Sequence, residues 1–176
     1  MKRLLNRSFA ALQLALVLIV GACAFAPVAQ AGALSDYLEN KLTDHVFRGV
    51  AYTAPTTIYV ALFTSACSDA AAGTEVSGGS YARPGLAAST TNWAATNGAT
   101  TTTNPSTGTG GTTSNNVAIT FATPSVGWGT VTYIGLMDAV SAGNLLVCTA
   151  LTTSKTINSG DTVSFPISSL TNQIDN

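Results

Sequence analysis

The sequence predicts a mainly β domain, in which one N-terminal amphipathic helix precedes an antiparallel β-sandwich of about six to seven strands. Three observations support this class. Apolar residues recur every four positions between Leu34 and Val46, the period changes to two after Pro55, and turn motifs rather than helical segments separate the later apolar runs. Strands at such spacing, without intervening helices, indicate a sandwich or barrel.

A helix is expected over residues 35–48. Ser35 and Asp36 supply N-cap chemistry, and Gly49 follows where a C-cap glycine belongs. Because its apolar residues occupy one face, the helix should pack on a surface, either that of its own sheet or that of a neighbouring subunit. His45, the single histidine of the chain, lies near the helix end, and no second imidazole, thiolate pair or carboxylate cluster accompanies it for a metal site.

Five strands are expected from alternating apolar residues. They centre on residues 58–63, 117–121, 130–138, 145–151 and 163–167. The first is apolar on both faces and is expected at the centre of a sheet, whereas Pro166 lacks a backbone donor and favours a sheet edge for the last. Short segments at 75–77 and 81–83 would bring the number to six or seven. Hairpin-type turns are expected at 141–144 and 158–161.

Residues 89–116 differ from the rest of the chain. These 28 residues include 11 threonines, no charge, and Trp93 as the single large apolar side chain. A stretch this poor in apolar area is expected to form a long surface loop or a flexible insertion, although threonine also suits polar strands backed by other chains. Trp93, Tyr52 and Tyr81 are the rings that would contact a partner or stack on a sugar.

Residues 1–31 have the pattern of an export signal. Three basic residues precede an apolar run at 9–20, and small residues precede position 32. Cleavage there would release a single domain of residues 32–176. A lipobox-like VGAC at 20–23 gives a second interpretation, in which cleavage leaves Cys23 for lipid attachment and membrane anchoring. A retained apolar arm is the third.

Two cysteines, Cys67 and Cys148, lie beyond the signal. In an exported chain an even number of cysteines permits a disulfide, here across a separation of 81 residues. The alternative is two small buried thiols. The residues alone leave both interpretations open.

The charge composition excludes several classes of function. Residues 32–176 carry four basic and eight acidic residues, and hence a net charge of −4. A nucleic-acid binder needs a basic footprint that this composition cannot supply. With one histidine, and with most carboxylates at helix and turn positions, we expect no catalytic, cofactor-binding or metal-binding set of residues and therefore no enzyme.

Several collinear blocks resemble small bacteriophage tail fibre proteins. They include LSDYLENKL at 34–42, TIYVALFTS at 57–65 and GTEVSGGSYAR at 73–83, and they continue in order through 128–131, 135–138, 143–146 and 151–161. The resemblance implies a β-rich, non-enzymatic virion component. Such a protein would act as a homo-oligomer or by contact with other phage structural proteins.

Three features depart from that family: the export signal, the expanded threonine-rich stretch and the two cysteines. The signal and the cysteines suit an exported, oxidising location. Two further functions therefore stand beside the virion protein. One is a secreted cell-surface, periplasmic or filament subunit whose sheet edges are completed by neighbours. The other is a secreted carbohydrate-binding module that uses Trp93, Tyr52 or Tyr81.

Overall fold

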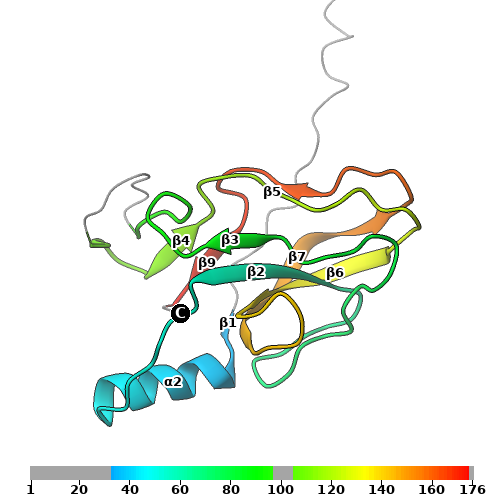
Figure 1. Ribbon diagram of the computed structural model, residues 1–176. Coiled ribbons are helices and arrows are strands. Elements are labelled where there is room, and N and C mark those ends of the chain that lie inside the picture. Colours follow the sequence, from blue (N-terminus) through cyan, green and yellow to red (C-terminus); the bar gives the residue numbers. More distant parts are fainter. Residues whose placement is uncertain (1–32, 97–104, 175–176) are drawn as a thin grey trace, which may run out of the picture.

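The largest element of the fold is a five-stranded antiparallel sheet. The computed structural model describes residues 33–96 and 105–174. Within them the strands of this sheet follow the order β1-β7-β6-β2-β3 (Figure 1). Their bounds are Ala33–Leu34 for β1, Thr57–Phe63 for β2, Gly85–Ala87 for β3, Gly129–Met137 for β6 and Leu145–Ile157 for β7.

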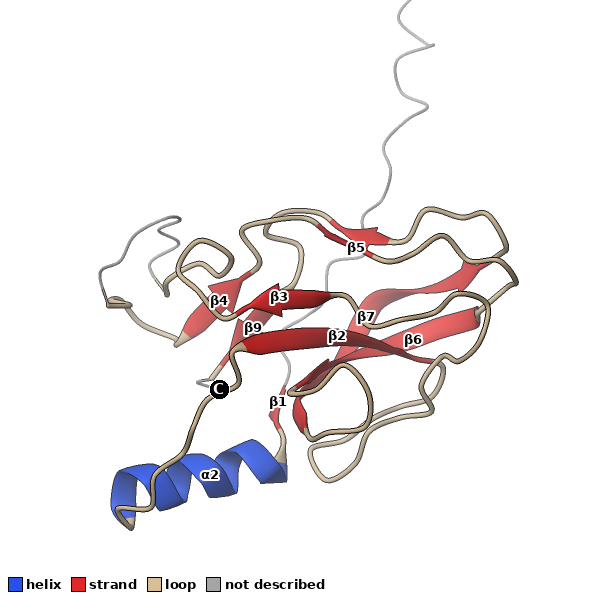
Figure 2. Cartoon of the chain, in the orientation of Figure 1, coloured by secondary structure: helices blue, strands red, loops and turns tan. Residues whose placement is uncertain are grey.

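Two short antiparallel ribbons form a second layer on one face of this sheet. One pairs β4 (Thr112–Ser114) with β9 (Thr171–Gln173), and the other pairs β5 (Ile119–Thr120) with β8 (Ser164–Phe165). Ile119 and Phe165 pack in one buried cluster with Val60 and Ile134 of the large sheet, so this main core lies between the layers. The mainly β, antiparallel prediction is confirmed, with a second layer of short strands joined by long loops (Figure 2).

A smaller core covers the opposite face of the large sheet. Alternation along β2 sends Val60 and Leu62 into the main core and Ala61 and Phe63 into the smaller one. The ring of Phe63 lies against Gly135 of β6, where an added Cβ would come within 2.5 Å of its Cε2 atom. The close packing of this ring therefore requires glycine at position 135.

Helix α2 (Asp36–Phe47) matches the predicted helix within one residue at each end. Ser35 is extended, its hydroxyl accepts a hydrogen bond from the Leu38 N–H at 3.2 Å, and its own N–H donates to the Leu146 carbonyl at 2.9 Å. This cap fixes the helix N-terminus to β7. Beyond the helix, Gly49 adopts a φ of +69°, the left-handed conformation expected after a helix C-terminus.

The three long predicted strands are confirmed as β2, β6 and β7. The prediction for the two shorter ones was too long, since only Ile119–Thr120 and Ser164–Phe165 pair as β5 and β8. The structure describes nine strands in residues 33–96 and 105–174, against six or seven expected, because several are two or three residues long. Of the segments 75–77 and 81–83, the first makes only an isolated bridge from Glu75 to Phe63, and the nearby strand is β3.

The two predicted turns differ in outcome. Residues 141–144 join the hairpin β6–β7, with φ values of 50° at Ala142 and 74° at Gly143. Residues 158–161 also turn, and the Asp161 carboxylate accepts from the Asn158 N–H at 2.7 Å. The hairpin prediction is wrong there, because β7 pairs with β6 whereas β8 pairs with β5. This turn carries the chain from one layer to the other.

The threonine-rich segment is tied to the fold at its C-terminal end. Thr112–Ser114 forms β4, and the Asn115 side chain next to it is completely buried. The Asn115 amide donates to the carbonyls of Val117 at 2.8 Å and Pro166 at 2.7 Å and accepts from the Leu170 N–H at 2.9 Å. A surface loop throughout is therefore the wrong description for 112–115. The export signal and Cys23 lie outside the described residues.

Candidate functional site

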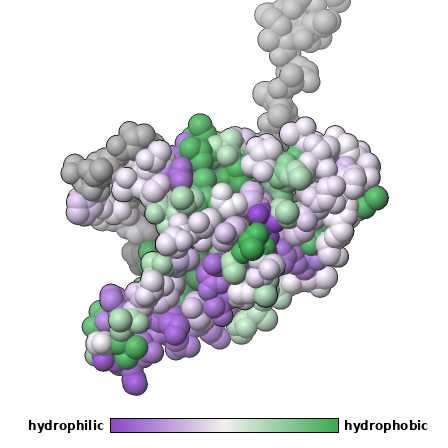
Figure 3. All heavy atoms as spheres, viewed as in Figure 1, coloured by the Kyte–Doolittle hydropathy of each residue, from purple (hydrophilic) through white to green (hydrophobic). Residues whose placement is uncertain are grey.

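Helix α2 leaves an apolar end exposed. Its first turn packs on the main core through Tyr37 and Leu38, but the following turns diverge from the sheet. As a result Val46 is 65%, Phe47 82% and Val50 50% exposed. We call these three residues the helix-end patch. Figure 3 shows apolar side chains at this end of the molecule among hydrophilic ones.

The local contacts at the helix end are polar and exposed. The His45 Nδ1 atom accepts from the Tyr52 N–H at 3.3 Å, and Arg48 forms an ion pair with Asp44 at 2.8 Å. His45 therefore has a structural contact. Tyr52 is half-buried, and this burial, together with nearby Tyr37 and the charge of Asp138, raises the pKa of its phenol.

Tyr81 is part of the core rather than an exposed ring. Its ring packs edge-on against Trp128, with centroids 5.3 Å apart, and stacks on Phe121 at 6.1 Å. Its hydroxyl accepts from the Leu62 N–H at 3.0 Å and donates to Glu75 Oε1 at 2.8 Å. Burial raises the pKa of this phenol, so it stays protonated and remains a donor.

Arg83 connects the loop of Glu75 and Tyr81 to the β6–β7 hairpin. Its Nε and Nη2 atoms donate to the two Glu75 carboxylate oxygens at 2.7 and 2.6 Å, and Nη1 donates to the carbonyls of Ala139 and Ala142 at 2.8 and 2.9 Å. Burial alone would raise the pKa of Glu75, but the hydrogen bonds from Arg83 and Tyr81 and the Arg83 charge outweigh it and lower that pKa. The cluster therefore holds the loop of Glu75 and Tyr81 against the β6–β7 hairpin.

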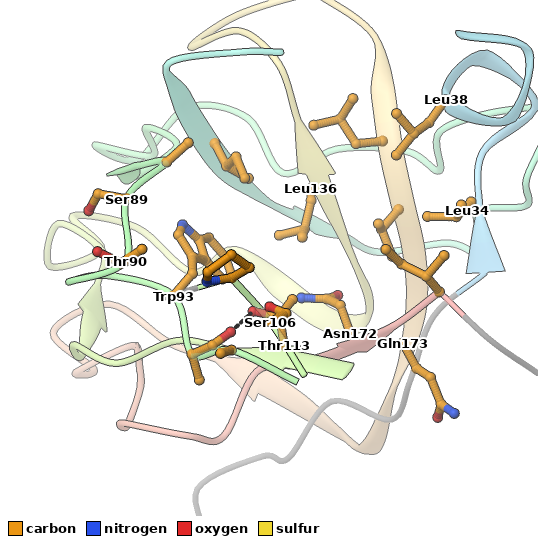
Figure 4. A pocket seen from close by; sticks show the side chains of 18 residues that line it. Leu34, Leu38, Ser89, Thr90, Trp93, Ser106, Thr113, Leu136, Asn172 and Gln173 are labelled. Atoms are coloured by element: carbon orange, nitrogen blue, oxygen red, sulfur yellow. Dashed lines mark hydrogen bonds between the residues drawn. The ribbon is translucent and has the colours of Figure 1, made fainter. Parts of the chain in front are cut away.

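A cavity of about 610 Å³ lies between helix α2, the large sheet and the β4–β9 ribbon. Figure 4 shows Trp93 and Asn172 pointing into it, Leu34 and Leu38 on the opposite side, and Leu136 between them. No described lining residue is charged, and most of the wall is apolar. We call this cavity the Trp93–Asn172 pocket.

Two polar side chains of the pocket have buried atoms without a hydrogen-bond partner. They are the Nε1 atom of Trp93 and both the Oδ1 and Nδ2 atoms of Asn172. The Asn172 residue is 6% exposed. Because nearly all buried polar groups in folded proteins are paired, three such atoms in one cavity mark it as a candidate binding site.

The structure joins Cys67 and Cys148 in a disulfide, with Cα atoms 6.0 Å apart. Cys148 lies in β7 within the smaller core, and Cys67 lies in the loop that follows β2. The bond therefore fastens this loop over the face of the sheet that carries Phe63.

In residues 33–96 and 105–174, three or more histidine, cysteine or acidic side chains nowhere gather in a geometry that could hold a metal ion. Within the same ranges the structure describes one helix, α2, and its 12 residues are too few to span a bilayer.

Residues 33–173 match the family described as podophage GP4 fiber I protein gp80. The chain belongs to this family. The match begins at β1 and ends at β9, so it contains every strand described above. The gp80 fibre family consists of phage fibre proteins, so the chain is a structural phage protein associated with the virion. No curated protein sequence matches it.

Sequence patterns identified part of these surfaces. The sequence singles out Trp93 as a ring in a polar segment, and Trp93 lines the pocket. These patterns do not single out Asn172, or Phe47 and Val50 of the helix-end patch, whereas Val46 belongs to the apolar stripe expected to pack on the sheet or on a neighbouring subunit. The pair Val46–Phe47 before Gly49 was a usable signal, because two large apolar residues at a helix end need a partner. An unpaired asparagine has no counterpart in a single sequence.

Proposed function

We propose that this gp80-family chain is a non-enzymatic fibre subunit that assembles through protein–protein contacts. The helix-end patch carries this proposal. Val46 and Phe47 at the end of the capped helix α2, and Val50 just beyond it, expose apolar surface away from the body of the domain. Exposed apolar surface of this kind marks contact sites, and aromatic residues dominate the energy of such contacts.

The patch is suited to a copy of the same chain or to another virion protein. Full burial of one large apolar side chain contributes about 1.5–3 kcal/mol, so three of them can anchor an interface whose remaining area only excludes water. The exposed Asp44–Arg48 pair beside the patch supplies a polar rim.

The test is the oligomeric state of the full chain, measured by sedimentation velocity over a concentration series. We expect wild-type protein to self-associate and Phe47→Ser to shift the transition to at least tenfold higher concentration. The matched control is Ile167→Ser, an exposed apolar residue (60%) far along the chain from α2. A wild-type protein that stays monomeric throughout, or equal weakening by both substitutions, would refute contact between copies through this patch.

A second candidate, an exported subunit on the same scaffold, is favoured by the Cys67–Cys148 disulfide. Disulfides persist in oxidising compartments and are rare in the cytosol. Fractionation of cells that express the full gene, followed by intact-mass analysis, tests this candidate. Export predicts a periplasmic or extracellular product that lacks residues 1–31 or begins at a lipid-modified Cys23. A full-length cytosolic product with two free thiols at positions 67 and 148 contradicts it.

A further inference from the structure

We propose that the Trp93–Asn172 pocket binds an extended, uncharged peptide segment with apolar side chains, supplied by another protein. The pocket is separate from the helix-end patch, since Leu34 and Leu38 line it at the opposite end of α2. That the donor is another fibre subunit rests on the proposed function, whereas binding of the peptide does not.

The wall of the pocket determines which kind of side chain the ligand can have. Leu34, Leu38, Leu136 and the Trp93 ring face the cavity, and none of the described lining residues carries a charge. A charged group placed there would lose its hydration without gaining a counterion. The occupant must therefore be neutral, with apolar groups that replace water along the wall.

The Asn172 amide sets the polar group of the ligand. Its Oδ1 atom requires a donor and its Nδ2 atom requires an acceptor, and both are buried and unpaired. One residue of an extended chain directs its N–H and its C=O toward the same edge, which is how paired antiparallel residues exchange two hydrogen bonds. The Asn172 carboxamide can exchange the same two hydrogen bonds with such a residue, as the backbone of a partner strand would. The Trp93 Nε1–H then donates to a further carbonyl of the same segment.

The contrast with Asn115 shows that the fold does pair a buried amide where that amide is structural. Asn115 is also buried, and its side chain uses three hydrogen bonds to Val117, Pro166 and Leu170. The Asn172 side chain, in β9, has none. Its backbone pairs in the ribbon with Thr113, so the strand needs no amide side chain at this position. The free amide is consistent with a ligand site.

The probe that tests this proposal is the fluorophore-labelled peptide acetyl-Ala-Val-Ala-Val-Ala-amide, titrated with the full chain by fluorescence anisotropy. A matched peptide with glutamate in place of the second valine tests neutrality. We expect saturable binding of the first peptide and affinity at least tenfold weaker for the second. No saturable binding of the neutral peptide, or equal affinity for both, would overturn the proposal.

The decisive variant is Asn172→Leu, of similar size and without polar atoms. Loss of two hydrogen bonds predicts affinity for the neutral peptide reduced by about tenfold or more. The urea midpoint of the free variant should be unchanged or higher, because an unpaired buried amide has been removed. Unchanged affinity, or a lower midpoint that shows a structural role for Asn172, would contradict the proposal.

Two further arms separate this proposal from its alternatives. Phe47→Ser should bind the peptide like wild type, so that failure of self-association and failure of peptide binding are distinguishable. Displacement of the peptide by N,N′-diacetylchitobiose would overturn the proposal in favour of a saccharide site. Absence of displacement supports a peptide ligand.

Discussion

Substitution of Glu75 by glutamine should show how strongly the Arg83 cluster fastens the fold. The Arg83 side chain is 6% exposed and the Glu75 side chain 27%, and their bidentate contact measures 2.6 Å at its shorter bond. Removing one partner of a fully buried pair costs about 3–5 kcal/mol because an uncompensated charge remains. Partial exposure of Glu75 reduces this, so we expect Glu75→Gln to lower the free energy of unfolding by about 2–4 kcal/mol.

Urea denaturation at pH 7, followed by the fluorescence of the two tryptophans, Trp93 and Trp128, measures this loss. The control is Asp44→Asn, which removes the exposed ion pair to Arg48 and should cost about 0.5 kcal/mol or less. A loss below about 1 kcal/mol for Glu75→Gln, or equal losses in the two variants, would show that the Glu75–Arg83 pair does not hold the fold together.

The same cluster gives a pH dependence. The folded-state pKa of Glu75 lies below its ordinary value of 4.5. A carboxyl with a lowered pKa contributes stability that is present above its unfolded pKa and is lost as pH falls through its folded pKa. The stability advantage of wild type over Glu75→Gln should therefore be constant above about pH 5 and shrink progressively below pH 4.5. An advantage that stays constant down to pH 3 would contradict it.

Three further predictions concern stability in urea. Gly135→Ala should cost about 1–3 kcal/mol, because the new methyl group would overlap the Phe63 ring; a loss under 0.5 kcal/mol, at roughly the noise of the method, would refute this. Reduction of the Cys67–Cys148 bond should lower stability by up to about 4.5 kcal/mol for a separation of 81 residues, and an unchanged midpoint in reductant would contradict it. Asn115→Leu should cost about 3 kcal/mol, since the buried Leu170 N–H and the part-buried carbonyls of Val117 and Pro166 lose their partner, and a neutral effect would disprove its structural role.

The elements that could be predicted from the sequence are those set by local periodicity. Helix α2 and strands β2, β6 and β7 combine a regular apolar pattern with capping or turn residues, and each lies where the pattern indicates. The short strands could not be predicted in this way. Strand β4 contains only Thr-Thr-Ser, and it pairs with β9, where its central residue Thr113 lies opposite Asn172, 59 residues further along the chain.

The candidate surfaces were predicted less completely because they depend on how elements diverge and pack. The apolar stripe of α2 favours packing on its own sheet and leaves contact with a neighbouring subunit as the alternative. In the structure, the first turn of α2 packs on its own sheet, while Phe47 at the other end of the helix remains exposed. Asn115 and Asn172 are both buried asparagines in polar sequence, and only their three-dimensional surroundings distinguish the paired amide from the unpaired one.

Presence in phage particles tests whether the chain is an assembled fibre subunit. Phage particles from a lysate that carries the gene would be banded by density and analysed by quantitative mass spectrometry, beside particles from a matched lysate encoding Phe47→Ser. We predict a fixed ratio of the wild-type chain to the other virion proteins, and a folded variant that remains outside the particle band. Wild-type chain confined to the unbanded fraction, or equal incorporation of the variant, would contradict incorporation through the helix-end patch.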